Sequence, residues 1–360
     1  MSVIKIESRL GDYEVNINSS NVFLKSLVGL GHKLFLVDEN VWHYYAGGIL
    51  SELPRSSETM IFPSLESRKT LEGVQEVYEY LINQSAKRNM TLITIGGGIL
   101  QDITGFAACT LYRGIRWVFI PTTLLAQSDS CIGSKTSLNY KGYKNLIGTF
   151  YPPSIVWINP LFINTLTTQD FYSGLGEIIK LHIIGGESKI QQMLENYDLI
   201  CARDEVALQN AIQSSLEIKR GYIVNDEFDN GQRNMLNYGH CVGHALESVS
   251  EFRIPHGQAV IVGMMIANYI ASERGVLSNE KRCFIEKKLL VPSLKTEFNA
   301  SDFRAEEIIK AMGKDKKRTS SGLVMIMLKD SNEMIKVKNL EPIEVEKALK
   351  KYGEALNNDQ

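Results

Sequence analysis

The first part of the chain alternates short apolar runs with segments of helical periodicity. His32–Val37 is an apolar run followed by Asp38, a pattern typical of a buried parallel strand with a polar residue at its carboxyl edge. Ser64–Ala86 spaces its apolar residues three and four apart, which predicts an amphipathic helix. This alternation predicts an α/β fold with a parallel sheet. The other expected elements are the strands Val3–Glu7, Tyr13–Ile17, Met90–Ile95 and Trp117–Ile120, the extended run Ser154–Ile158, and a helix at Ile99–Leu111.

From about Asn164 the pattern changes to longer segments of helical periodicity. We therefore expect a boundary near Leu161, with an α/β domain over residues 1–161 and a mostly helical domain over residues 162–360. One strand pair is expected near Gly322–Leu328 and Met334–Val337. The expected helices are Thr168–Ile184, Lys189–Glu195, Asp204–Asn225, Gly231–Ser250, Ala259–Arg274, Asn279–Leu290, Ala305–Met312 and Pro342–Leu356.

Length and composition narrow the class of protein. A chain of 360 residues exceeds most single cores, so two domains are expected. The net charge of −2 gives no electrostatic footprint for nucleic acid, and no apolar run reaches the length of a membrane helix. The N-terminal residues carry charges throughout, so we expect no secretory signal. The five scattered cysteines form no CxxC pair, which argues against a disulfide framework and a zinc finger. We expect a cytoplasmic protein that acts on a small molecule.

A triple glycine follows one of the predicted strands. The strand Met90–Ile95 runs into Gly96-Gly97-Gly98 and then into a helix, a geometry that can receive a pyrophosphate because the backbone can approach the ligand closely. The spacing is not the GxGxxG pattern, so a tight strand–helix turn is an equal alternative. Asp38 could accept hydrogen bonds from a ribose, or it could cap a helix.

Three histidines fall within seventeen residues and suggest a metal site. His240 and His244 lie four residues apart on one predicted helix face, and His256 opens the next helix. Two helix-borne imidazoles and a third from the following segment can converge on a metal. Glu177 lies on a largely apolar helix face, where an unpaired charge would be costly. It therefore needs a partner, either a metal or Lys180 one helical turn later.

The segment Pro121–Asn145 reads as a polar loop that is too long for a simple connector. Asp129, Lys135, Lys144 and Asn145 could surround an anionic substrate, although a solvated surface is the usual place for such charges. Further cations lie near apolar segments, namely Arg113, Lys219, Arg233, Lys316 and Lys317. Together with the metal motif and the glycine turn, these cations favour a phosphate or carboxylate substrate.

These segments, in this order, resemble the 3-dehydroquinate synthases of the sugar-phosphate cyclase family. The resemblance covers nearly the whole chain, and it implies a Rossmann-like NAD-binding α/β domain, a mostly helical metal-binding domain and a homodimer. The matching stretches are ESRK (66–69), GGGILQDITGFAA (96–108), LYRGIRWVFIPTTLLAQSDSCIGSKT (111–136), KNLIGTFYPP (144–153), SGLGEIIK (173–180), EIKRGYIVNDEFDNGQRNMLNYGHCVGHALE (217–247), HGQAV (256–260) and KDKK (314–317).

The resemblance also implies roles for particular residues. Zinc or cobalt would be held by Glu177, His240 and His256, whereas His244 would lie near the substrate phosphate and relay protons. NAD would contact Asp38, Glu66, Lys69, Gly97, Gly98, Asp102, Thr122 and Thr123. The substrate would contact Asp129, Lys135, Lys144, Asn145, Lys180, Lys219, Arg233, Asn237 and Lys316, with Arg113 reaching the neighbouring subunit's site.

The resemblance favours a carboxylated substrate. In 3-dehydroquinate synthases the substrate carboxylate is expected to meet residues that match Lys219 and Arg233. Valiolone synthases typically lose the second histidine of HxxxH, and 2-deoxy-scyllo-inosose synthases commonly carry glutamate where Asn237 stands. The implied reaction is the shikimate-pathway conversion of 3-deoxy-D-arabino-heptulosonate 7-phosphate to 3-dehydroquinate and phosphate. It involves transient oxidation by NAD, β-elimination, re-reduction and aldol closure.

Some positions depart from the family pattern and keep alternatives open. Gln258 stands where glutamate is usual, Ser134 and Tyr143 replace glycines, the segment after Leu166 reads TTQD, and YPP replaces YQP at 151–153. A divergent cyclase of a secondary pathway, similar to 2-deoxy-scyllo-inosose synthase or aminodehydroquinate synthase, is one alternative. A metal-dependent polyol dehydrogenase of the glycerol dehydrogenase type and a catalytically inactive binding protein are the others.

Overall fold

The structure, a computed structural model, describes residues 2–20, 22–54, 57–313 and 323–358. The chain forms two compact units, one of Met1–Leu166 with Leu208–Asp229, and one of Thr167–Ala207 with Asn230–Gln360. The sequence predicts a second domain that runs without interruption over 162–360, whereas in the structure Leu208–Asp229 belongs to the first unit. The reason is a set of polar contacts with the N-terminal part, such as the Arg9 backbone N–H to Glu227 Oε2 at 2.9 Å.

The first unit is built on a seven-stranded sheet with the order β1-β2-β9-β6-β5-β3-β4. Its pairs are parallel except β1 with β2, whose six-residue connection is too short for a parallel crossover. The predicted α/β sheet is therefore confirmed, with one antiparallel edge. The strands are β1 (Ser2–Ile6), β2 (Tyr13–Ile17), β3 (Lys33–Asp38), β4 (Thr59–Phe62), β5 (Thr91–Gly96), β6 (Arg116–Pro121) and β9 (Ile155–Ile158).

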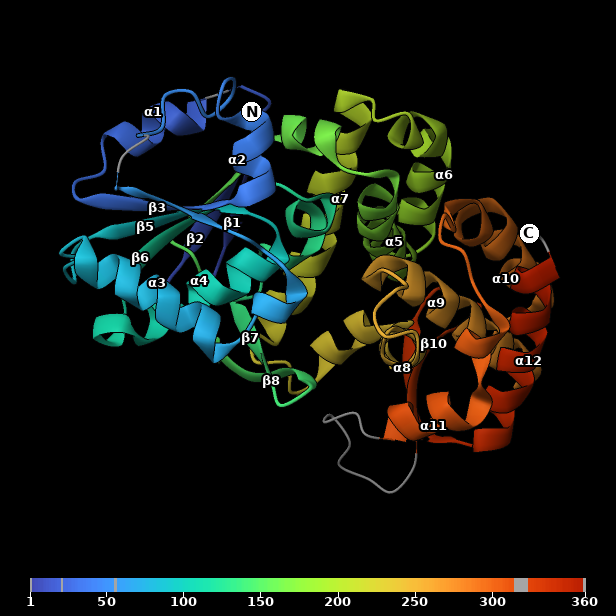
Figure 1. Cartoon of the computed structure of the whole chain (residues 1–360). Helices are drawn as coiled ribbons and strands as arrows, with labels where there is room; N and C mark the ends of the chain where they lie inside the picture. Colours follow the sequence, from blue (N-terminus) through green and yellow to red (C-terminus); the bar gives the residue numbers. More distant parts are fainter. Residues whose placement is uncertain (1, 21, 55–56, 314–322, 359–360) are drawn as a thin grey trace. The chain divides into compact units, whose positions relative to one another are not determined.

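Helices cover both faces of this sheet (Figure 1). Helices α1 (Val22–Val28) and α2 (Glu39–Tyr45) lie on one face, and α3 (Leu71–Asn83) and α4 (Gly98–Thr110) lie on the other. Between the sheet and the first pair, an apolar core gathers buried side chains from strands and helices, including Phe23, Phe35, Ile93 and Val118. Helix α7 (Glu205–Asn225) carries Leu208–Asn225 into this unit.

The segment expected to be a polar loop contains regular structure. A short π-helical turn at Ala126–Ser130 precedes an antiparallel hairpin of β7 (Lys135–Tyr140) and β8 (Tyr143–Phe150). The hairpin turns at Lys141 and Gly142, both with positive φ, as a two-residue hairpin turn of type I′ requires. Polar residues lie on both faces of the hairpin, so its sequence lacks the alternation of apolar and polar residues that marks a strand and resembles that of a loop.

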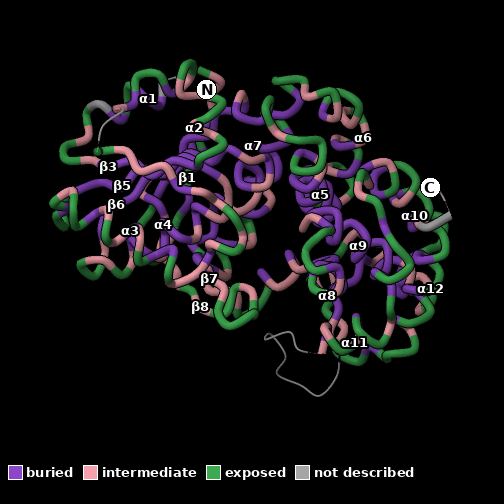
Figure 2. The backbone as a smooth tube through the Cα atoms, viewed as in Figure 1, coloured by how far each residue is buried: buried purple, intermediate pink, exposed green. Residues whose placement is uncertain are grey.

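The second unit is mostly helical, as expected, and its strand pair is antiparallel. Helix α9 is buried on nearly all sides, which agrees with its almost continuous apolar sequence (Figure 2). The elements are α5 (Thr168–Ile184), α6 (Glu187–Cys201), α8 (His240–Val249), α9 (His256–Glu273), α10 (Asn279–Ile285), α11 (Ala305–Gly313), α12 (Pro342–Asn358), β10 (Leu323–Leu328) and β11 (Met334–Leu340). Within the described residues, no helix combines the length and apolar character needed to cross a membrane.

One expected helix, Gly231–Ser250, is interrupted in the structure. A 3₁₀ turn covers Gln232–Asn237, and α8 begins only at His240. The break lies at Gly239, which adopts a left-handed conformation with φ of 79°. A Cβ at Gly239 would lie 2.6 Å from the Val260 carbonyl oxygen, so this glycine also permits close contact with α9. The interruption makes His240 the first residue of its helix.

Candidate active site

The first turn of α9 contacts α5 backbone to backbone. A Cβ on Gly257 would lie 1.8 Å from the carbonyl oxygen of Ser173, and a Cβ on Gly176 would lie 2.5 Å from the carbonyl oxygen of Gly257. The Gly257 backbone N–H donates to Ser173 Oγ at 3.0 Å. Only glycine fits these two positions, and the resulting contact brings Glu177 on α5 beside His256 on α9.

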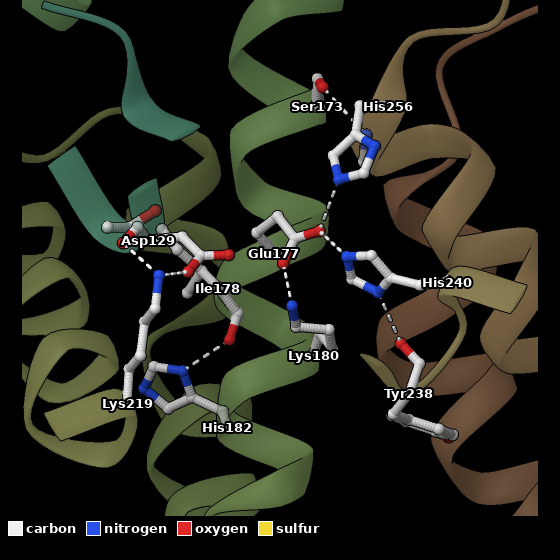
Figure 3. A network of polar contacts seen from close by, with 12 residues as sticks. Asp129, Ser173, Glu177, Ile178, Lys180, His182, Lys219, Tyr238, His240 and His256 are labelled. Atoms are coloured by element: carbon white, nitrogen blue, oxygen red, sulfur yellow. Dashed lines mark hydrogen bonds and ion pairs between the residues drawn. The ribbon is translucent and has the colours of Figure 1, made fainter. Parts of the chain in front are cut away.

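Two histidines converge on one oxygen of Glu177 (Figure 3). His256 Nε2 lies 3.1 Å from Glu177 Oε1, and His240 Nε2 lies 3.4 Å from the same oxygen. The other oxygen, Glu177 Oε2, forms an ion pair with Lys180 Nζ. Glu177 is fully buried and Lys180 is nearly so. The sequence left a metal and Lys180 as alternative partners of Glu177, and the structure provides both Lys180 and a histidine pair that could hold a metal.

The opposite nitrogen of each of these histidines is also held. His240 Nδ1 lies 3.2 Å from the carbonyl oxygen of Tyr238, which can only accept a hydrogen bond. His256 Nδ1 lies 3.1 Å from Oε2 of the buried Glu247. With Nδ1 donating, Nε2 is the nitrogen that each ring can offer to a metal. The sequence pattern did not reveal Glu247, because its position depends on the chain reversal between α8 and α9.

His244 belongs to the same group of side chains. Its ring lies 5.2 Å from the ring of His240 and 5.7 Å from that of His256, measured between centroids. One ring nitrogen from each of the three histidines lies within 4.8 Å of those of the other two. His244 is more exposed than the other two. The predicted cluster of three histidines is therefore present, and distance alone does not separate ligands from non-ligands.

The charges around the two histidines differ. Burial lowers the pKa of His240 well below its ordinary value, and the Lys180 ammonium adds to this effect. Burial also acts to lower the pKa of His256, but the carboxylates of Glu247 and Glu177 outweigh it and raise the pKa to about 10. A metal ion would therefore have to displace a proton from His256.

At the carboxyl edge of the sheet, the residues expected to bind NAD lie at the ends of neighbouring strands. The Thr122 N–H donates to the Gly96 carbonyl at 3.0 Å, which links the end of β6 to the end of β5. A Cβ on Gly97 would lie 2.9 Å from Thr123 Cγ2. Gly97 is the N-cap of the thirteen-residue helix α4 and provides no side-chain cap. The helix therefore presents backbone N–H groups beside Gly98, an arrangement suited to an anion.

Asp38 ends β3 on the other side of β5. Its Oδ1 accepts hydrogen bonds from the N–H groups of Asn40 at 2.8 Å and Val41 at 3.1 Å, so it caps α2. The chain passes from β3 outward to β4 and returns as β5 on the other side of β3. In doubly wound sheets such a switch point is the usual place for a dinucleotide. Helix capping and a ribose contact are therefore compatible roles for Asp38.

A polar network joins the hairpin to the remaining expected NAD residues. Lys69 Nζ lies 2.7 Å from Asp102 Oδ2, and the Ser137 N–H donates to Asp102 Oδ1 at 3.1 Å. Burial raises the pKa of Asp102, while Lys69 and Ser137 act against this rise. Asn139 Nδ2 donates to Glu66 Oε1 at 2.8 Å. Ser137 and Asn139 belong to the segment that was expected to be a loop, so the sequence pattern did not place them in this network.

The expected substrate residues of the first unit fall into separate groups. Lys219 on α7 pairs with Asp129, and its Nζ also donates to the Asp129 carbonyl at 2.6 Å. Lys135 Nζ lies 2.7 Å from Asp229 Oδ2.

Lys144 and Asn145, also expected to bind substrate, lie on the hairpin beside the residues expected to bind NAD. Lys144 Nζ is 3.8 Å from Glu66 Oε1, and the Asn145 N–H donates to Asn139 Oδ1 at 3.0 Å. These contacts place Lys144 and Asn145 with the expected cofactor residues and not with Lys219.

The remaining expected substrate residues are found on other elements. Arg233 is buried on the 3₁₀ turn before His240, and Asn237 Nδ2 donates to the Asn234 carbonyl at 3.0 Å on the same turn. Arg113 is exposed just after α4. Lys316 and Lys317 lie outside the residues that the structure describes.

Solved structures show which class of fold this is. The 2-epi-5-epi-valiolone synthase of Streptomyces hygroscopicus subsp. jinggangensis 5008, solved with NAD+ and Zn2+ bound, aligns with a TM-score of 0.83 at 22% identity, covering 97% of this chain and 99% of that one. A 2-deoxy-scyllo-inosose synthase complexed with carbaglucose-6-phosphate, NAD+ and Co2+ aligns at 0.79 and 21% identity, covering 97% and 100%. Glycerol dehydrogenase from Schizosaccharomyces pombe gives 0.64 at 16% identity, covering 96% and 90%. The fold is that of the sugar-phosphate cyclases and, with a lower TM-score, that of glycerol dehydrogenase.

The family follows from sequence matches. The model described as 3-dehydroquinate synthase N-terminal matches residues 59–173, and that described as 3-dehydroquinate synthase C-terminal matches residues 174–318. A protein named 3-dehydroquinate synthase from Clostridium tetani is 35% identical over 357 residues, covering 98% of this chain and 90% of the relative. The chain belongs to the 3-dehydroquinate synthase family.

Proposed function

We propose that this protein is a 3-dehydroquinate synthase that converts 3-deoxy-D-arabino-heptulosonate 7-phosphate to 3-dehydroquinate and phosphate. One observation carries the proposal: Nε2 of His240 and of His256 converge on one oxygen of the buried Glu177. Family membership and the buried Lys219 and Arg233 support the choice of substrate.

The residues around Glu177 fit a divalent metal. Two imidazole nitrogens and a carboxylate oxygen are the donor set of many catalytic zinc sites, which leave a further position for substrate. Both imidazoles have Nδ1 directed at an oxygen, as metal-bound histidines usually do. We propose Glu177, His240 and His256 as ligands of zinc or cobalt, and His244 as a proton-relay residue because it is the most exposed of the three histidines.

The first unit fits NAD. We propose that the N-terminus of α4 at Gly97 and Gly98 binds the pyrophosphate and that Asp38 at the switch point binds a ribose. Glu66, Lys69 and Asp102 form one network with the hairpin and would surround the rest of the cofactor. Thr122 and Thr123 follow the neighbouring strand β6 and complete the set.

The substrate carries a carboxylate and a phosphate, so it needs several cations. We propose that Lys219 and Arg233 bind the carboxylate, since both are buried cations and a guanidinium can bind a carboxylate in bidentate fashion. Lys135, Lys144, Asn145, Asn237 and Lys316 would hold the phosphate and hydroxyl groups. Asp129 would keep Lys219 in place, and Lys180 would balance the charge of Glu177.

When bound, NAD supplies a hydride acceptor that is regenerated in each turnover, and the metal supplies a Lewis acid that lowers the pKa of a substrate hydroxyl. The chain's own residues would orient the substrate, and His244 would exchange a proton with it. The overall conversion releases phosphate with no net oxidation.

The departures from the family pattern do not touch the proposed ligands. Gln258 Nε2 donates to the carbonyls of Tyr172 at 3.1 Å and Ser293 at 3.0 Å, and its Oε1 accepts from the Lys295 N–H at 2.7 Å. It therefore serves packing around α9. Tyr143 is exposed near the tip of the hairpin. These contacts give no reason to prefer a substrate without a carboxylate.

The decisive experiment measures phosphate release and identifies the products from a panel of heptulosonate, heptulose and hexose phosphates, with NAD and zinc present. We expect release from the heptulosonate phosphate without net NADH, and loss of activity on chelation or in His240→Ala. The matched control, Glu280→Gln, neutralises an exposed carboxylate on α10 and should behave as wild type. Reaction of a neutral sugar phosphate alone would indicate a divergent cyclase. NADH accumulation from simple polyols would indicate a dehydrogenase, and absence of metal binding would indicate a binding protein.

We also propose that the enzyme is a cytoplasmic homodimer in which Arg113 reaches the partner's site. Its exposure after α4 leaves it available for such a contact. Light scattering gives the oligomeric state. Mixing inactive Arg113→Ala with inactive His240→Ala protein should restore part of the activity if the residues serve different subunits' sites, and no recovery would refute the shared site.

A further inference from the structure

Glu247 is a buried carboxylate that the proposed chemistry leaves without a role. It lies in the last part of α8, and its side chain is 9% exposed. Its Oε2 lies 3.1 Å from His256 Nδ1, on the side of the ring opposite Glu177. His256 is thus held between two carboxylates, one at each nitrogen.

The position of His256 explains why it needs such a contact. It is the first residue of α9, and its N-cap, Pro255, provides no side-chain hydrogen bond. The neighbouring Gly257 is fixed by its contact with α5, but this contact sets only the backbone. The imidazole can still rotate and can carry its proton on either nitrogen. A carboxylate at Nδ1 fixes both the rotation and the proton, and leaves Nε2 directed at Glu177 Oε1.

The two histidines are held by different kinds of acceptor. His240 Nδ1 meets the neutral carbonyl of Tyr238, whereas His256 Nδ1 meets the carboxylate of Glu247. A hydrogen bond to an ionised acceptor is stronger than one to a neutral acceptor and makes the imidazole a more basic ligand. His256 should therefore be the stronger of the two nitrogen donors.

We infer that Glu247 is a positioning residue for the metal: it holds His256 with Nδ1 protonated and Nε2 turned toward the site. This inference rests on the proposed metal site and adds a residue to it. In this role Glu247 acts through His256 and is not itself a ligand.

The test measures metal affinity directly, by competition with a chromophoric chelator, together with the visible spectrum of the cobalt-loaded protein. Glu247→Gln keeps the size of the side chain but removes its charge, and Glu247→Ala removes the acceptor. We expect affinity to fall about 10- to 100-fold in Glu247→Ala, with Glu247→Gln intermediate and the cobalt spectrum altered in both. Glu273→Gln, which neutralises an exposed carboxylate at the far end of α9, is the matched control and should bind as wild type.

Two further measurements separate positioning from a general structural effect. The far-UV circular dichroism of the metal-free protein and its affinity for NAD should be the same in Glu247→Gln as in wild type. In a His256→Ala background, Glu247→Gln should change metal affinity less than twofold, because the ring through which it acts is gone.

Unchanged metal affinity in both Glu247 variants would overturn the inference, as would an equal loss with and without His256. If the wild-type protein binds no metal, the proposed function itself fails. If it binds metal and the Glu247 variants match it, only the role of Glu247 is wrong.

Discussion

Replacing Gly257 by alanine should disable the metal cluster without touching any of its side chains. The added Cβ would lie 1.8 Å from the Ser173 carbonyl oxygen, and real Cβ atoms do not approach closer than 3.0 Å. The two backbones must therefore separate by more than 1 Å. His256 precedes Gly257 and Glu177 lies one turn after Ser173, so the 3.1 Å contact between their side chains would lengthen correspondingly. A misplacement of about 1 Å can cost on the order of 100-fold in rate.

The assay combines zinc affinity, turnover and thermal unfolding. We expect Gly257→Ala to bind zinc at least about 10-fold more weakly, and forced overpacking to cost about 1–3 kcal/mol of stability. Gly221→Ala is the matched control, because Gly221 lies within helix α7 and a Cβ there meets nothing within 4 Å. It should leave stability unchanged or raise it by about 0.4–1 kcal/mol. Wild-type zinc affinity and melting temperature in Gly257→Ala would refute the argument that this backbone contact positions the ligands.

Three other predictions test separate parts of the molecule. Burial lowers the pKa of His182 to about 4, so between about pH 6.5 and 4 the unfolded chain binds more protons than the folded one. The free energy of unfolding should therefore fall by up to about 3 kcal/mol as the pH drops through this window. Urea unfolding at pH 7 and pH 5 should show a smaller loss of stability in His182→Gln than in wild type, and equal losses would contradict the prediction. Lys219→Met should raise KM for the heptulosonate phosphate about 10- to 100-fold, the equivalent of one charge-assisted hydrogen bond, and an unchanged KM would exclude Lys219 from the site. Asn139→Leu removes the hydrogen bond to Glu66 and should weaken NAD binding while zinc affinity stays constant. Calorimetric titration with NAD and with zinc measures the two affinities.

Much of the fold follows from local patterns. Helix α5 was expected at Thr168–Ile184 and has these bounds, because Thr167 caps its start and its apolar periodicity ends at a glycine pair. The buried strands β3 and β5 were equally visible as apolar runs. The hairpin β7–β8 was missed, since its strands are polar on both faces and its pairing depends on a turn. Helices α1 and α2 were also missed, because seven residues are too few to establish a period.

The candidate site could be predicted in part. The spacing of the histidines indicated a cluster, and the structure brings His240, His244 and His256 together. Their partners could not be derived from spacing. Glu247 reaches His256 only because the chain reverses between α8 and α9, and Glu177 reaches it only through the glycine contact. The separate positions of Lys144 and Lys219 depend on the unexpected hairpin.

The ion pair between Lys180 and Glu177 bears on how the enzyme would acquire its metal. A fully buried carboxylate without a counter-charge would oppose folding, and in small zinc domains the metal itself provides that charge. Here an ammonium on the same helix provides a counter-charge from one turn away. The burial of Glu177 therefore does not depend on a metal for charge balance, and we expect that the polypeptide can fold first and load a metal afterwards. Occupancy would then follow the supply of zinc or cobalt in the cell, and a chelated sample should remain folded and regain activity when either ion is added back.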